Sequence, residues 1–186
     1  PYLLRPCGML DSWSLSQSRL KKGLYLKLFS SSLFQRGNLL HFTTNAERDK
    51  SHFPDVMDSV VIGNGLSKES FLPRDVAKEF NATFPELTGK KLVLFLGRVD
   101  PKKQPDVVIR AFSEIVGMDV QLHLVVAGPY ENAYRADLER IAIELGIVDR
   151  VMFTGMLSGN VLYGAYRAAF LYVLPSHQEN FGISVA

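Results

Sequence analysis

Apolar residues follow two regular patterns in the second half of the chain. Short, almost continuous apolar runs predict buried strands at residues 92–96, 121–126, 150–153 and 170–174. Between these runs, apolar residues recur with the spacing of one helical face, which predicts helices at 105–116, 132–145 and 159–169. Strands that alternate with helices form right-handed crossovers, so we expect an α/β fold with a Rossmann-like parallel sheet.

The part of the chain before residue 67 carries the pattern of a smaller α/β unit. Apolar runs predict strands at 39–44 and 59–62, and a helix is expected between them at 45–51. The chain has 186 residues and is 47% hydrophobic, which is enough to bury a core. We therefore expect residues 1–66 to form the end of a first domain.

A change in composition predicts the domain boundary. Gly63-Asn64-Gly65 is typical of a turn, and the following stretch, 67–91, is polar and punctuated by proline. We expect this stretch to be a linker with one short helix around 75–80. A second domain is then expected at 92–186.

The basic residues are concentrated near the start of the chain. Residues 1–50 carry eight Lys or Arg against three Asp or Glu, which leaves a local charge of +5, whereas the whole chain has +2. Within 13–36, a basic amphipathic helix is predicted by apolar residues that recur every three to four positions: Leu20, Leu24, Tyr25, Leu28 and Phe29.

Two interpretations of this helix remain open. We expect first that its apolar stripe packs onto its own domain, because any core-facing helix shows such a stripe. The alternative is peripheral contact of residues 13–36 with an anionic membrane surface. A nucleic-acid partner is not expected, because the charge is modest and no recognition motif accompanies it.

A cationic loop follows the first strand of the second domain. Gly97 ends the apolar run, and Arg98 and Lys103 precede the helix predicted at 105–116. Arginine offers a planar fork of donors for phosphate oxygens, lysine adds a compact charge, and a helix N-terminus adds amides and a dipole. This combination suits a diphosphate. A solvated basic loop is the alternative interpretation.

Glu179 follows the last predicted strand. Pro175 cannot continue a central strand, and Gly182, followed by apolar residues, predicts the opening of a helix. Glu179 is therefore expected at the carboxyl end of a parallel strand, where open α/β sheets bind ligands. A carboxylate there can hold hydroxyl groups, and the alternative is a solvated loop acid.

Four segments follow one another along the chain, each at the carboxyl end of a predicted strand. They are Gly97-Arg98 with Lys103, Val125-Val126-Ala127-Gly128, Val151-Met152-Phe153-Thr154-Gly155, and Pro175-Ser176 leading to Glu179, Phe181 and Gly182. Together they resemble the donor half of the retaining, nucleotide-sugar-dependent glycosyltransferases of family 4, which have the two-domain GT-B architecture. The resemblance covers most of the chain. It implies a donor-binding domain at 92–186 and the end of the acceptor-side domain at 1–66.

The resemblance also implies roles for individual residues. Arg98 and Lys103 would stabilise the departing diphosphate, and Glu179 would contact the donor sugar, so these three are the catalytic candidates. Contacts with the donor are implied for residues around them: Gly97, Gly128, Thr154, Gly155, Met156, Leu157, His177, Asn180, Phe181 and Gly182. The loop at 154–157 would flank the nucleobase. The alternative for the glycines is that they only turn the chain.

The sequence departs from the family pattern in two places. The family's second glutamate lies eight residues after the first, which would be position 187, and the sequence ends at 186. We therefore expect a fragment whose donor domain is incomplete at its C-terminus and which is inactive alone. Family members often have His-Gly where this chain has Cys7-Gly8.

The implied activity is transfer of a sugar from a UDP-, GDP- or ADP-sugar to an acceptor hydroxyl, with retention and without a metal or redox cofactor. The acceptor would be a saccharide or a lipid-linked sugar. Two alternatives stay open, namely a non-catalytic nucleotide-binding fragment and a GT-B-fold sugar-nucleotide epimerase or phosphorylase.

Other kinds of site are not favoured by the spacing of residues. The glycine-rich turn of the dinucleotide fingerprint is missing after 92–96, and no Asp-x-Asp pair offers metal ligands. The four histidines are not spaced as a zinc cluster.

Cys7 is the single cysteine, so an internal disulfide is impossible and a reducing cytoplasm is expected. With no apolar run near the roughly 18 residues of a membrane span, the enzyme is expected in the cytoplasm or at the inner face of the membrane.

Overall fold

The computed structural model describes residues 2–17, 19–33, 38–53, 57–66 and 76–185, with side chains in the helix at 19–33 described for 19–25, 27 and 28. The chain divides into two compact units. The first contains Pro1–Ser70 and Gln178–Ala186, and the second contains Phe71–His177. The division expected from the sequence differs at two places, which are described with each unit below.

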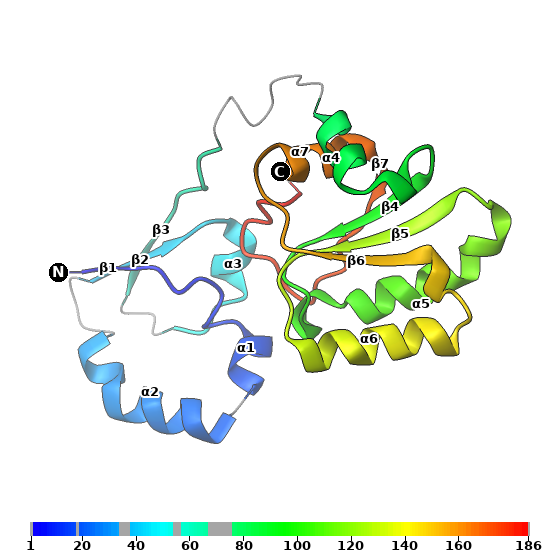
Figure 1. Cartoon of the computed structure of the whole chain (residues 1–186). Coiled ribbons are helices and arrows are strands. Elements are labelled where there is room, and N and C mark those ends of the chain that lie inside the picture. The colour runs from blue at the N-terminus through cyan, green and yellow to red at the C-terminus, as the bar shows by residue number, and fades with distance from the viewer. Residues whose placement is uncertain (1, 18, 34–37, 54–56, 67–75, 186) are drawn as a thin grey trace. The chain divides into compact units, whose positions relative to one another are not determined.

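The second unit is built on a four-stranded, fully parallel sheet in the order β6-β5-β4-β7 (Figure 1). Its strands are β4 (Lys91–Leu96), β5 (Leu122–Ala127), β6 (Val151–Gly155) and β7 (Ala169–Tyr172). The predicted α/β fold with a parallel sheet is confirmed. All four apolar runs identified in the sequence form strands of this sheet.

Helices cover both faces of this sheet. On one face lie α5 (Pro105–Ile115) and α6 (Asn132–Glu144), and on the other lie α4 (Ala77–Thr83) and α7 (Gly159–Ala168) (Figure 1). Successive side chains of a strand point to opposite faces, so β4 sends Val93 and Phe95 toward α5 and Leu92 and Leu94 toward α7. All four side chains are buried, which explains why the strand reads as a continuous apolar run.

The stretch expected to be a linker, 67–91, contributes to the second unit. Residues 67–75 lie outside the described residues, but α4 and the short turn η2 (Pro85–Leu87) pack into this unit. Phe80 on α4 is fully buried against α7. Gly164 on α7 allows this approach, because a β-carbon there would lie 2.7 Å from the Cβ of Phe80. The part of the predicted linker after residue 76 is therefore core structure.

Three further single turns connect the elements of the second unit. They are η3 (Pro101–Lys103), η4 (Val116–Met118) and η5 (Val148–Arg150). The first of these carries Lys103 and lies directly before α5.

The first unit contains a three-stranded parallel sheet in the order β1-β2-β3. Its elements are β1 (Leu3–Leu4), β2 (Leu39–Phe42), α3 (Asn45–Asp49) and β3 (Asp58–Val61). Leu40, Phe42 and Met57 form a small buried core. The strands and the helix predicted for residues 39–62 are present, each one or two residues different in its bounds.

The predicted basic helix is present, but its apolar stripe is not buried. It follows α1 (Ser12–Ser16) and forms α2 (Arg19–Leu33). Leu20, Leu24 and Leu28 are 90%, 60% and 62% exposed. The expectation that this stripe packs onto its own domain is therefore wrong for these three leucines. The side chain of Phe29 lies outside the described residues.

The last nine residues group with the first unit, not with the domain expected at 92–186. Their contacts explain this, because the hydroxyl of Thr44 donates to the carbonyl of Asn180 at 3.0 Å. Gly182 does not open a helix among the described residues. Its φ of +68° is left-handed, and the following residues form a turn closed by the Val185 N–H and the Gly182 carbonyl at 2.8 Å.

Across the described part of the chain, none of the helices has the length and apolar character that crossing a membrane requires.

Candidate functional site

The carboxyl ends of β4, β5 and β6 meet through main-chain hydrogen bonds. The Gly97 N–H donates to the Ala127 carbonyl at 3.0 Å, and the Gly128 N–H donates to the Gly155 carbonyl at 2.8 Å. Gly97, Gly128 and Gly155, which the sequence placed at three strand ends, are thus neighbours along one edge of the sheet. This is the edge at which parallel α/β sheets bind ligands.

The loop after β4 is organised by Asp100. Its carboxylate forms an ion pair with Arg98, with 3.5 Å between Oδ2 and Nη2, and its Oδ1 accepts a hydrogen bond from the Lys103 N–H at 3.2 Å. Gln104 then takes a left-handed conformation, with φ of +53°, and α5 begins at Pro105. Asp100 therefore holds the Arg98 side chain and the main chain of Lys103, the two residues predicted to bind a diphosphate.

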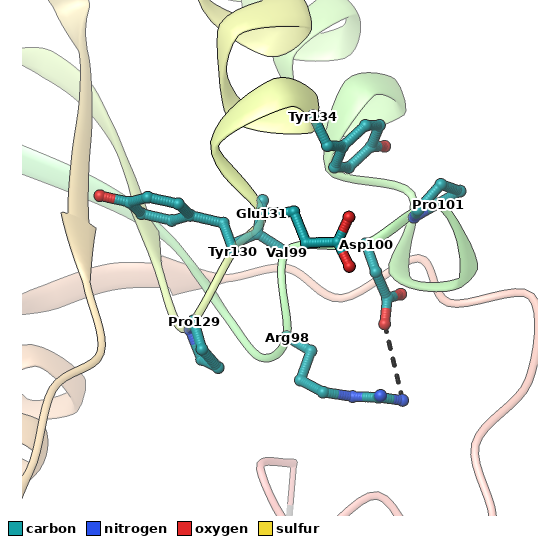
Figure 2. A pocket seen from close by; sticks show the side chains of 8 residues that line it. All are labelled: Arg98, Val99, Asp100, Pro101, Pro129, Tyr130, Glu131 and Tyr134. Atoms are coloured by element: carbon teal, nitrogen blue, oxygen red, sulfur yellow. Dashed lines mark ion pairs between the residues drawn. The ribbon is translucent and has the colours of Figure 1, made fainter.

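A cavity of about 370 Å³ lies beside this loop, at the ends of β4 and β5 and the start of α6 (Figure 2). Of the two predicted cations, Arg98 lines it, and its guanidinium is turned toward Asp100. The remaining lining residues come from the loops after β4 and β5 and from α6: Val99, Asp100, Pro101, Pro129, Tyr130, Glu131 and Tyr134. The arginine side chain is 67% exposed, so its remaining donors can reach a ligand.

Two tyrosines of this cavity were not anticipated from the sequence. Burial, aided by the nearby carboxylates of Asp106 and Asp100, raises the pKa of Tyr134 to about 12. Its phenol is therefore protonated at neutral pH. Tyr130 is held in place by Arg135, whose Nη1 donates to the Tyr130 hydroxyl at 2.6 Å and whose guanidinium also stacks over the ring. The signal in the sequence was weak: Tyr130 directly follows Gly128-Pro129, and Tyr134 lies four residues farther on.

The end of β6 and the loop that follows it contain the four residues proposed to flank a nucleobase. Gly155 has a left-handed φ of +73°, and the Thr154 hydroxyl donates to its carbonyl at 3.1 Å. Met156 is 75% exposed, whereas Leu157 packs against the core between β4 and α7. Within this loop, Met156 is accordingly the side chain most accessible to a ligand.

The loop after β7 touches the cationic loop. The His177 N–H donates to the Lys102 carbonyl at 2.9 Å, next to Lys103. The two loops are neighbours because β7 pairs with β4. The His177 side chain is exposed.

Glu179, Asn180, Phe181 and Gly182 lie in the first unit, whereas Arg98 and Lys103 lie in the second. The segment 178–182 packs over Gly8, at which a β-carbon would lie 3.1 Å from the amide nitrogen of Gln178. The side-chain oxygens of Gln178 and Asn180 are buried and have no hydrogen-bond partner among the described residues.

A buried carboxylate supports this region of the first unit. Glu47 is 2% exposed and accepts hydrogen bonds from the Gly8 N–H at 2.9 Å, the Thr43 N–H at 2.8 Å and the Thr43 hydroxyl at 2.7 Å. This role was not predictable from the sequence, because one glutamate in a short helix has the pattern of a surface residue.

Metal ligands do not gather within the described residues. No three His, Cys, Asp or Glu side chains among them come close enough together to hold a metal ion.

Comparison with known proteins identifies the family. The family model for glycosyl transferases group 1 matches residues 77–186. The D-inositol 3-phosphate glycosyltransferase of Mycolicibacterium smegmatis is 39% identical over 127 residues, which cover 66% of this chain and 28% of the relative. The enzyme of the same name from Frankia alni is 32% identical over 164 residues, covering 84% and 38%. The chain thus spans well under half the length of these relatives.

Solved structures share the fold of the chain. Anabaena HepE, crystallised with UDP and glucose, has a TM-score of 0.76 and 18% identity, covering 100% of this chain and 49% of HepE. WaaG, a glycosyltransferase involved in lipopolysaccharide biosynthesis, has a TM-score of 0.76 and 17% identity, covering 98% and 52%. These likenesses confirm the GT-B type of α/β fold. The family model matches more than half of this chain, so the chain belongs to the glycosyl transferases group 1 family.

Proposed function

We propose that the chain contributes the donor site of an enzyme that moves a sugar from a nucleotide-diphosphate sugar to an acceptor hydroxyl. The observation that carries this proposal is the cationic loop at the carboxyl end of β4, where Asp100 holds the Arg98 guanidinium and the main-chain N–H of Lys103. Support also comes from the family, and from a structural neighbour that was crystallised with UDP and glucose.

Charge development during the reaction explains the need for this loop. When the glycosidic bond breaks, negative charge grows on the departing diphosphate, and fixed positive groups nearby lower the barrier. Arg98 supplies a planar fork of donors and Lys103 a compact charge. In this proposal the two cations stabilise the departing diphosphate, which other transferases do with a divalent ion, so no metal or other cofactor takes part.

Glu179 is proposed to hold a hydroxyl of the donor sugar. It follows His177 by two residues in the chain, and the His177 N–H is bonded to the cationic loop at Lys102. Retention of the anomeric configuration is proposed from the resemblance to family 4. The nucleobase is proposed to lie against Gly155 and Met156, because the exposed loop after β6 borders the same sheet edge.

The acceptor is proposed to be a saccharide or a lipid-linked sugar, and the enzyme is proposed to act in the cytoplasm. Contact of residues 13–36 with the inner face of a membrane would suit a lipid-linked acceptor.

The test uses the full-length parent protein and a panel of UDP-, GDP- and ADP-sugars. Calorimetry identifies the donor that binds, and release of nucleoside diphosphate is then measured with and without candidate acceptors. Arg98→Ala and Lys103→Ala should each lower the rate about a hundredfold, since one charge-assisted donor at a developing anion is worth on the order of 3 kcal/mol. Arg110→Ala, which removes an exposed arginine from α5, is the matched control.

Three results would contradict the proposal. The double variant of Arg98 and Lys103 could keep the normal transfer rate, which would remove these residues from the site. Donor binding without release of nucleoside diphosphate would indicate a binding module. A change of the bound sugar without any acceptor would indicate an epimerase.

A further inference from the structure

α2 lies next to α1 in the first unit (Figure 1). It presents an exposed apolar face. Leu20, Leu24 and Leu28 follow each other every four residues, so they line one side of the helix over about 80° of its circumference. Their exposed fractions are 90%, 60% and 62%. Tyr25, 53% exposed, lies about 60° beyond Leu28 around the helix, on the far side of Lys21. Single exposed apolar side chains are common on protein surfaces, but a contiguous row of them marks an interaction site.

Positive charges border the row of three leucines on both sides. Around the helix, Lys27 lies about 20° from Leu20, and Lys21 lies about 20° from Leu28. Both lysines are exposed. Arg19 and Lys22 add two more cations, and the sequence of α2 contains no Asp or Glu.

We propose that this face of α2, formed by Leu20, Leu24, Tyr25 and Leu28 with Lys21 and Lys27, docks on an anionic membrane surface. The leucines would enter the boundary between headgroups and acyl chains, and the tyrosine hydroxyl would stay at the headgroup level. The lysine stems lie along the apolar boundary while their ammonium groups reach lipid phosphates. The local charge of residues 1–50, eight cations against three anions, adds attraction from the surrounding surface.

The arrangement of charge favours lipid over a second copy of the chain. A symmetric dimer through this face would place the same patch on both sides of the interface, so the bordering lysines would meet lysines. Like charges across an interface are unfavourable, and α2 offers no carboxylate to relieve them. An anionic bilayer satisfies the apolar face and the lysines together.

The test measures flotation of the 186-residue chain with vesicles of phosphatidylcholine alone and of phosphatidylcholine mixed with phosphatidylglycerol. Binding is expected to the mixed vesicles only and should weaken as salt rises. Leu24→Gln with Leu28→Gln should lower the partition about tenfold or more. Lys21→Gln with Lys27→Gln should lower it about fivefold for each charge removed. Glutamine has nearly the helix propensity of leucine and lysine, so α2 is kept.

The control replaces two exposed apolar residues of the second unit, Met118 and Val120, by glutamine, and this variant should bind as the unchanged chain does. The proposal is overturned if the unchanged chain binds neither kind of vesicle, or binds both equally. It is also overturned if the α2 variants float like the control. A dimer in analytical ultracentrifugation that the leucine variant dissociates would assign the face to a second copy instead. Donor binding plays no part in these measurements, so they are independent of the proposed activity.

Discussion

The α-carbon of Gly128 lies against the main-chain carbonyl group of Gly97, where β5 and β4 end side by side. A β-carbon at position 128 would overlap the Gly97 oxygen and lie 2.7 Å from its carbonyl carbon, and the φ of Gly128 is +139°. Only glycine fits this conformation and this space. Because Gly97 directly precedes Arg98, the contact fixes the point at which the cationic loop leaves the sheet.

Gly128→Ala should therefore destabilise the second unit. The new methyl group forces the two strand ends apart and strains the backbone, which together should cost on the order of 3 kcal/mol. Thermal unfolding followed by circular dichroism should show a melting temperature lower by about 10 °C. Gly117→Ala is the control, since a β-carbon there meets no atom within 4 Å. Equal melting temperatures for the two variants would disprove the role of the contact.

The second unit was largely predictable from local sequence. A strand segment covered on both faces, such as 92–96, must be apolar throughout, and a helix such as α5 must show one apolar face, so both leave a clear pattern. Gly97, Gly128 and Gly155 were predictable because each ends such a strand. The short helix expected around 75–80 is present as α4, but its packing into the core was not expected, because Phe80 is the single buried residue of this seven-residue helix.

Tertiary contacts explain what the sequence did not predict. The exposure of Leu20 depends on what α2 packs against, which the helical period alone does not specify. Tyr130 and Tyr134 line the cavity because the loop after β5 folds over the end of β4, where Val99 pairs with Tyr130. Glu47 reaches Gly8 across 39 residues of sequence. No local pattern encodes such distant partners.

Asp100→Asn should strengthen the binding of inorganic pyrophosphate to the 186-residue chain. Asparagine can still accept the hydrogen bond from the Lys103 N–H, but it no longer neutralises Arg98. Because Arg98 is largely exposed, the gain should be at most about fivefold in affinity. Isothermal calorimetry measures this gain. Asp149→Asn, an exposed carboxylate in η5 near the start of β6, is the matched control and should change little. Weaker binding by the Asp100 variant would show that Asp100 acts mainly by shaping the loop.

Gly164→Ala should separate α4 from α7. The added methyl group would lie 2.7 Å from the Cβ of Phe80, a main-chain-anchored atom that cannot move aside by rotating a side chain. Overpacking of this kind costs about 1–3 kcal/mol. Urea unfolding should show a lower midpoint for this variant, and hydrogen exchange should rise in 77–83. Arg167→Ala, at an exposed position of the same helix, should leave both measurements unchanged.

Glu47→Gln tests whether the buried carboxylate holds the loop at Gly8. Both carboxylate oxygens accept hydrogen bonds from main-chain N–H groups, and Oε2 also accepts one from the Thr43 hydroxyl. Glutamine replaces one of these oxygens by an NH2 group, so at this buried position, where Glu47 is 2% exposed, a donor would face the N–H of Gly8 or of Thr43. The loss should be about 3 kcal/mol in the free energy of unfolding, and the Gly8 amide should exchange faster with solvent.

Two companion variants calibrate that loss. Thr43→Val removes only the hydroxyl donor and should cost about 1 kcal/mol. Asp49→Asn changes an exposed carboxylate at the end of the same helix, which is paired with Arg48, and should stay within about 0.5 kcal/mol of the unchanged chain. If Glu47→Gln lowers the free energy of unfolding no more than Asp49→Asn does, the carboxylate does not hold the loop at Gly8. A buried acceptor of three hydrogen bonds that held this loop could not be replaced without a larger loss of stability.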